Sequence, residues 1–194
     1  MNIYDISQEL FSGRIFPGDS TPTLTKIRSI EAGDSYNLTD LQMCVHNATH
    51  IDAPAHFLPK GKTIEQIELS RCIGPASVIA FEGIITANDI KKRLQKSEKR
   101  VLFKGSGVLT PEAATELNKL GIILVGTESQ TVGDEENLAA IHLELLKKEV
   151  VILEGLVLKG IPEGHYFLFA APLKLGGVEG APCRAILINN YLTE

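Results

Sequence analysis

The pattern of apolar and polar positions changes near residue 75. Beyond this point, short apolar runs rich in β-branched residues alternate with segments that carry helix-capping residues. The predicted strands cover residues 76–81, 101–104, 122–125, 150–153, 166–170 and 185–188. Strands that alternate with helices in this way predict an α/β fold with a mixed central sheet.

The predicted helices are recognised by the capping and charged residues at their ends. Thr86 and Asp89 form a capping box at the start of a helix that runs to about residue 99. A threonine–proline pair begins the next helix, which ends before Gly121. Acidic residues precede a third helix over 138–148 and two lysines close it, as the helix macrodipole favours.

The first seventy residues have a different, irregular and strand-like pattern. Turn signals such as Pro17-Gly18-Asp19 interrupt it, and residues 41–45 read as a strand that leads into a histidine-rich segment. This half could form a β layer of its own, so the strand order stays open. Without an internal repeat or a low-complexity linker, residues 1–194 are predicted to form one domain.

Composition narrows the classes of function. Nineteen basic and twenty-four acidic residues give a net charge of −5, which offers no basic surface for nucleic acid. Three cysteines, far apart and without a CxxC pair, argue against a disulfide framework and favour a reducing compartment. No signal peptide and no apolar run of the roughly 18 to 20 residues that span a bilayer can be recognised. A soluble cytoplasmic protein without a membrane partner is expected.

The densest chemistry lies in segment 46–56, which holds three of the five histidines: His46, His50 and His56. Asp52 lies among them, and imidazole with carboxylate is a ligand set for Zn, Mn or Fe. Fully extended, His46 and His50 would lie about 13 Å apart, too far to share one ion. The segment must therefore turn tightly, and Pro54 suggests that Asp52 and His56 are presented from a turn. The alternative is an ordinary polar loop whose histidines bond to the backbone.

Two residues outside this segment are also candidates. His142 lies on the apolar face of its predicted helix, where a core histidine with one satisfied nitrogen is the simpler interpretation. Glu154 ends the apolar run 150–153, at the edge of the sheet where α/β proteins gather their ligands. A carboxylate that ends a buried strand is either functional or paired, because burying it alone is costly.

Segment 46–56 resembles the signature of a known family, the cyclase-type metal hydrolases that include bacterial kynurenine formamidase (arylformamidase). That signature is His-x-Gly-Thr-His-x-Asp-x-Pro-x-His, and Ala48 in place of glycine is the one departure. Similar stretches continue along nearly the whole chain: 5–7, 17–19, 109–114, 124–127, 172–175 and 181–185. His142 and Glu154 also occur at the family's spacing.

The resemblance implies a two-metal site and assigns its ligands. The implied ligands are His46, His50, Asp52, His142 and Glu154. The first three would hold one ion, and the last two would hold a second ion that Asp52 bridges. His56 would transfer protons, and Zn²⁺, with Mn²⁺ as the alternative, would be the cofactor. The implied fold is the family's swivelling β/β/α arrangement, usually assembled as a homodimer or homotetramer.

The activity implied is hydrolysis of an aryl formamide such as N-formylkynurenine by metal-activated water, with His56 as proton shuttle. Phe16 stands where formamidases of this type place a tryptophan against the aromatic substrate, and a phenyl ring stacks with less surface. Hydrolysis of another cyclic amide or ester, as in isatin-hydrolase-like or cyclase-like relatives, is the alternative activity. A non-catalytic metal-binding or metabolite-binding relative is the alternative class.

Overall fold

A large curled sheet organises the molecule. The computed structural model describes residues 1–189. Nine strands form the sheet in the order β1-β13-β11-β5-β7-β9-β10-β4-β12. Their bounds are β1 (Asn2–Asp5), β4 (His50–Asp52), β5 (Ile73–Ala80), β7 (Arg100–Lys104), β9 (Leu124–Thr127), β10 (Val151–Glu154), β11 (Gly164–Phe169), β12 (Gly180–Pro182) and β13 (Ile186–Asn189). The neighbours β5, β7, β9 and β10 run parallel, and the other pairs are antiparallel, so the predicted mixed sheet is confirmed.

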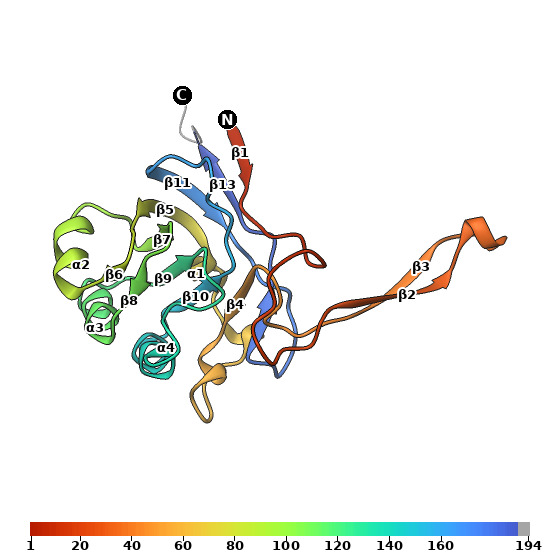
Figure 1. Cartoon of the computed structure of the whole chain (residues 1–194), viewed down its shortest axis with the longest axis horizontal. Helices are drawn as coiled ribbons and strands as arrows, with labels where there is room; N and C mark the ends of the chain where they lie inside the picture. Colours follow the sequence, from red (N-terminus) through yellow and green to blue (C-terminus); the bar gives the residue numbers. More distant parts are fainter. Residues whose placement is uncertain (190–194) are drawn as a thin grey trace.

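Three helices cover one face of this sheet (Figure 1). They are α2 (Ala87–Arg93), α3 (Pro111–Lys119) and α4 (Leu138–Leu146), and a single-turn helix, α1 (Leu69–Cys72), precedes β5. Two short strands, β6 (Ile84–Ile85) and β8 (Val108–Leu109), form a small parallel pair. Three 3-10 turns complete the set: η1 (Ile30–Ala32), η2 (Pro54–His56) and η3 (Ile64–Gln66).

The strand period of two sends alternate side chains into two separate cores. On β7, Val101 and Phe103 pack with the helices, whereas Leu102 packs into the other core. That second core joins Ile51 of β4 to Leu187 of β13, although these strands lie towards opposite ends of the strand order. The sheet therefore curls around this core, and the chain forms a single α/β domain, as expected.

All three helices begin where the sequence predicts; α3 also ends before Gly121 as expected, whereas α2 and α4 end earlier. The capping box of α2 is present: Thr86 N donates to Asp89 Oδ2 at 2.9 Å and Asp89 N donates to Thr86 Oγ1 at 3.3 Å. The helix ends at Arg93 instead of residue 99, because the chain leaves it at Leu94 and turns towards β7. α4 ends at Leu146 rather than 148, and Glu149 follows with a left-handed φ of 56°.

The N-terminal half does not form a layer of its own, since β1 and β4 join the main sheet. Only β2 (Thr23–Arg28) and β3 (Leu38–Gln42) stand apart, as a two-stranded ribbon that projects from the body (Figure 1). The strand predicted over 41–45 is therefore wrong in position, because it ends at Gln42. The chain must leave the ribbon there to make the turn that carries the histidines.

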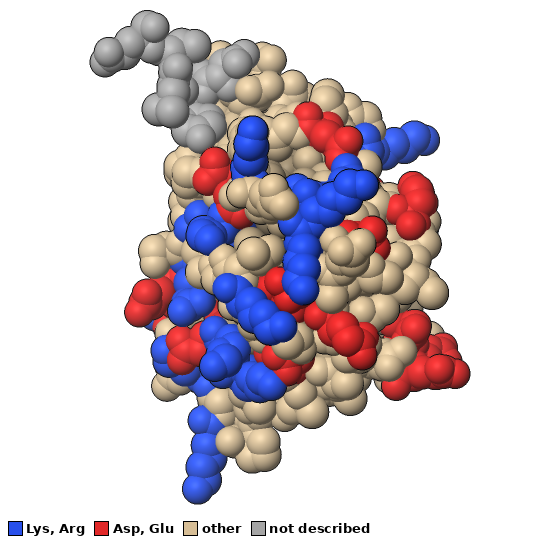
Figure 2. Space-filling view, turned by 90° about the vertical axis from the view of Figure 1, so that its left-hand side faces the viewer, with Lys and Arg blue, Asp and Glu red and all other residues tan. Residues whose placement is uncertain are grey.

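On the face that Figure 2 shows, lysine and arginine side chains are interspersed with aspartate and glutamate. The Glu116 carboxylate of α3 forms ion pairs with two lysines. Lys91 of α2 lies 3.7 Å from it, and Lys119 of α3 lies 3.3 Å from it. Among the described residues, no helix has the length and apolar character needed to cross a bilayer.

Candidate metal and catalytic site

The turn before β4 is held by buried hydrogen bonds. Asn47, fully buried, donates its N–H to Cys44 O at 3.2 Å, and its side-chain oxygen accepts from Cys44 N at 2.9 Å. Thr49 Oγ1 donates to Gly155 O at 2.6 Å and accepts from Gln8 N at 2.8 Å. The tight turn predicted for 46–50 is confirmed. It passes through Ala48 with φ of 54°, a left-handed conformation that suits glycine better than alanine.

Strand register places three candidates on one face of the sheet. His50 and Asp52 are two residues apart on β4, so both side chains point to the same side. Glu154 ends the neighbouring strand β10 directly opposite His50, and Asp52 lies opposite Ile152. Asp52 therefore comes from a strand and not from the predicted turn, because it pairs with both β10 and β12. His56 does come from a turn, η2.

Helix α4 brings His142 over the same face. Its Nδ1 donates to Leu138 O at 2.8 Å, and its Nε2 lies 3.5 Å from both Asp52 Oδ2 and Glu154 Oε1. His50 is arranged alike: Nδ1 donates to Ala48 O at 3.0 Å, and Nε2 lies 3.4 Å from Asp52 Oδ1 and 3.5 Å from Glu154 Oε2. A backbone bond at Nδ1 that leaves Nε2 facing carboxylates is the usual orientation of a metal-binding histidine.

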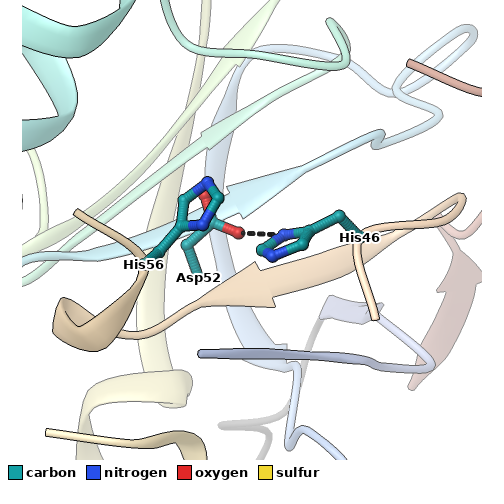
Figure 3. A group of neighbouring side chains, drawn as sticks. All are labelled: His46, Asp52 and His56. Carbon is teal, nitrogen blue, oxygen red and sulfur yellow. Dashed lines mark hydrogen bonds and ion pairs between the residues drawn. The ribbon is translucent and has the colours of Figure 1, made fainter. Parts of the chain in front are cut away.

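His46 and His56 complete the cluster on its open side. His46 Nδ1 lies 2.9 Å from Asp52 Oδ1, and the rings of His46 and His56 are 4.2 Å apart between centroids. Figure 3 shows the contact between His46 and Asp52, with His56 beside them. Among the described residues, His46 Nε2 and Asp52 Oδ2 are buried without a well-aligned hydrogen bond, and the charged groups that face them, Glu179 Oε1 and His142 Nε2, lie 3.5 Å away. Buried polar atoms left unpaired are costly, so this donor set fits a cation and supports a metal cofactor.

The electrostatics of the cluster also favour positive charge. Burial lowers the pKa of His142, but hydrogen bonds and charges from Asp52 and Glu154 outweigh it and raise this pKa to about 10. The same carboxylates hold the pKa of His50 well above its ordinary value despite burial. Burial works to raise the pKa of Asp52, but its contacts with three histidines keep it well below the usual range. Two buried carboxylates thus favour positive charge on the groups that face them.

The structure brings all five expected ligands together, and His56 with them. Two groups of potential ligand atoms each lie within 4.8 Å of one another: His46 with Asp52 and His56, and His50 with Asp52 and Glu154. This grouping differs from the implied division of ligands between two ions, in which His46 and His50 share one ion. Asp52 belongs to both groups and therefore lies at the centre of the cluster.

A cavity of about 240 Å³ opens above the cluster. Its lining residues are Phe16, Asp19, His46, His50, His56, Phe57, Gln130, Thr131, Leu138, His142 and Glu154. Phe57 stacks on His142 with ring centroids 4.6 Å apart and an interplanar angle of 24°. Phe16 and Phe57 are therefore both walls of the cavity, at half-buried positions.

Sequence reasoning missed the loop residues Gln130 and Thr131. They follow β9, at the carboxyl ends of the parallel strands, where Glu154 was recognised by the same edge argument. The polar residues that directly follow residues 124–127 could have identified them in the same way. Thr131 lines the cavity, and its buried Oγ1 has no hydrogen-bond partner among the described residues.

Comparison with known proteins places the chain among relatives of similar length. The Cyclase family model matches residues 4–134. A kynurenine formamidase of Salinibacter ruber is 35% identical, covering 96% of this chain and 97% of the relative, and one of Erythrobacter litoralis is 34% identical, covering 95% and 93%.

Solved structures show the same fold. A potential metal-dependent hydrolase with cyclase activity is 31% identical with a TM-score of 0.83, and covers 96% of both chains. Isatin hydrolase A from Labrenzia aggregata, at 22% identity and a TM-score of 0.82, covers 96% of this chain and 93% of its own, and shares the fold. On these matches and on the geometry of its site, the chain belongs to the Cyclase family.

Proposed function

We propose that the chain is a metal-dependent hydrolase of aryl formamides, with N-formylkynurenine as its substrate. The observation that carries the proposal is the convergence of three buried ionisable groups, His50, Asp52 and Glu154, with His142, beneath an aromatic-walled cavity. The activity of the kynurenine formamidases that are up to 35% identical over nearly the whole chain supports the choice of substrate.

The ligands proposed for the metal are His46, His50, Asp52, His142 and Glu154. Imidazole and carboxylate donors favour Zn²⁺, and Mn²⁺ would fit the same set. A divalent ion bound by these residues would lower the pKa of water to near neutrality and would polarise a carbonyl oxygen. Hydrogen bonds from His50 Nδ1 and His142 Nδ1 to backbone carbonyls keep each Nε2 aimed at the centre of the site.

His56 is proposed as the proton carrier. Burial lowers its pKa, and the charge of Asp52 only partly opposes that shift, so the ring is neutral at pH 7 and can accept a proton. It lines the cavity beside His46, and can deliver that proton to the departing amine. No acyl intermediate on a side chain is needed, since water is the nucleophile.

Phe16 and Phe57 are proposed to hold the aryl group. Both line the cavity, and Phe57 is fixed by its stacking on His142. A formamide group directed at the cluster would then leave the aromatic ring against these two phenyl groups.

The test is hydrolysis of N-formylkynurenine by the purified protein before and after chelation, with Zn²⁺ and Mn²⁺ added back separately. We expect chelation to lower turnover at least 100-fold, and one of the two ions to restore it. Turnover that survives complete removal of metal, verified by elemental analysis, contradicts the proposal.

A second candidate is hydrolysis of a cyclic aryl amide. The observation that favours it is Phe16 in the cavity wall, where formamidases of the type described above carry a tryptophan. Isatin and N-formylkynurenine assayed side by side distinguish the two: a higher kcat/KM for isatin would select the second candidate.

A further inference from the structure

The three histidines proposed as metal ligands are held in two different ways. In His50 and His142, Nδ1 donates to a backbone carbonyl and Nε2 faces the carboxylates of the cluster. His46 is turned the other way, because its Nδ1 is the atom that lies 2.9 Å from Asp52 Oδ1 (Figure 3). Within residues 1–189, no backbone carbonyl accepts a hydrogen bond from His46 Nε2. A ligand histidine needs a partner at its second ring nitrogen to hold its orientation, so His46 requires a different one.

The Glu179 carboxylate faces that second nitrogen. Glu179 Oε1 lies 3.5 Å from His46 Nε2, on the side of the ring away from the centre of the cluster. The backbone of Glu179 is fixed, since Ala53 N donates to Glu179 O at 2.8 Å. Its side chain is 43% exposed and free to move, whereas that of His46 is only 14% exposed. A small rotation of the carboxylate therefore brings it to the ~2.9 Å of a hydrogen bond.

The next residue, Gly180, leaves the space that the His46 ring fills. A Cβ atom on Gly180 would lie 2.8 Å from His46 Cε1 and 3.0 Å from Ile51 O. Carbon atoms make ordinary contact at roughly 3.5–4.0 Å, so any side chain here would push the ring away. The backbone of Gly180 cannot yield instead, because it pairs with Asp52 in the sheet. Glycine is thus required at this position for the close approach of the ring.

We propose that Glu179 and Gly180 position His46, so that Nδ1 of this histidine binds the metal while its Nε2 donates a hydrogen bond to the Glu179 carboxylate. The inference rests on the metal-dependent function and the ligand set proposed above. Gly180 sets where the ring lies, and Glu179 sets which ring nitrogen carries the proton and makes the imidazole a stronger ligand. Glu179 is not among the residues that line the cavity, so it acts through His46 and is a positioning residue.

The first test is the affinity of the metal-free protein for Zn²⁺, measured by competition with a chromogenic chelator. Glu179→Ala should raise the Zn²⁺ dissociation constant about 10- to 100-fold, the usual cost of removing the partner of a ligand histidine. Glu179→Gln keeps an oxygen that accepts the hydrogen bond, so it should lose less affinity than Glu179→Ala. Glu112→Ala is the control, because it removes an exposed carboxylate at the start of α3, outside the cavity lining, and should bind Zn²⁺ as the wild type does.

These measurements separate the positioning role from the proposed function. A wild-type protein that binds Zn²⁺ and a Glu179→Ala variant with the same dissociation constant would overturn the role of Glu179 and leave the ligand set intact. A wild-type protein that binds no Zn²⁺ would overturn the ligand set and the positioning role together. Neither result depends on which substrate the protein hydrolyses, and circular dichroism establishes that each variant is folded.

A pair of glycine variants tests the space for the ring. Gly180→Ala should weaken Zn²⁺ binding at least ~10-fold, because the added methyl group displaces the His46 ring from its partners. Gly176→Ala is the matched control, since a Cβ atom there would meet no other atom within 4 Å. Equal Zn²⁺ affinity in the two folded variants would contradict the role of Gly180.

Nitrogen NMR of the zinc-loaded protein, labelled with ¹⁵N in its histidines, tests the orientation of His46 directly. We expect one zinc-bound ring that is protonated at Nε2 and two, those of His50 and His142, that are protonated at Nδ1. In Glu179→Ala, the Nε2 proton of the first ring should exchange faster with water, while the Nδ1 protons of the other two should be unchanged. Three zinc-bound rings that are all protonated at Nδ1 would overturn the proposal.

Discussion

Two strands that follow one another along the chain have opposite surroundings. β3 (Leu38–Gln42) is exposed at every residue, and β4 (His50–Asp52), eight residues later, is buried at every residue. In β4 the buried polar groups are held by a network that fits a cation, whereas β3 leaves apolar groups in water. The comparison shows how a short stretch of chain separates a buried polar network from apolar side chains exposed on a ribbon.

The largest effect is expected from removing one of the proposed metal ligands of the site around β4. His50→Ala should lose metal and turnover together, with activity falling at least ~1,000-fold, because two carboxylates lose the imidazole that faces them. Elemental analysis and N-formylkynurenine hydrolysis measure both effects. His165→Ala is the control, an exposed histidine outside the cavity. Full metal occupancy in His50→Ala would remove His50 from the ligand set.

A substitution at His56 distinguishes a role in proton transfer from a role in metal binding. His56→Ala should keep its metal and lose about 10²- to 10⁴-fold in kcat, the usual contribution of a general acid–base group. Metal loss in this variant would instead identify His56 as a ligand, in line with its grouping with His46 and Asp52. Metal content and kcat measured on the same preparation decide between the two roles.

The free energy of unfolding should depend strongly on side chains of the buried strand β4 and little on those of the exposed strand β3. Ile51→Ala, at a fully buried position of β4, should cost about 2–5 kcal/mol of unfolding free energy. Leu38→Ala on the exposed ribbon of β2 and β3 should change it by less than about 0.5 kcal/mol. Urea unfolding of both variants measures the contrast, and equal losses would contradict the exposed position of the ribbon.

The smallest expected effect concerns the turn between the two regions. Ala48 holds a φ of 54°, and glycine adopts this conformation without the clash of a Cβ atom. Ala48→Gly should therefore stabilise the domain by about 0.5–1 kcal/mol, less the entropy that glycine adds to the unfolded chain. Thermal unfolding should shift upwards by about 1–4 °C. A lower midpoint would mean that relief of strain does not outweigh that entropy.

Much of the helical layer could be read from local signals. The capping box of Thr86 and Asp89 and the threonine–proline pair before α3 act over three or four residues, so both helix starts were predicted correctly. Helix ends were less predictable, because α2 stops where the chain must turn to feed β7. The candidate ligands were recognisable for a similar local reason, since imidazole and carboxylate groups cluster within residues 46–56.

What the sequence by itself determined was therefore the chemistry: which side chains carry ligand atoms, and that segment 46–56 must turn. Only the tertiary structure decided that Asp52 lies at the centre on a strand, that Gln130 and Thr131 line the same cavity, and that residues 23–42 project from the body as a two-stranded ribbon. Local signals act through the nearest few residues, whereas strand order and register depend on contacts between residues as distant as His50 and Glu154.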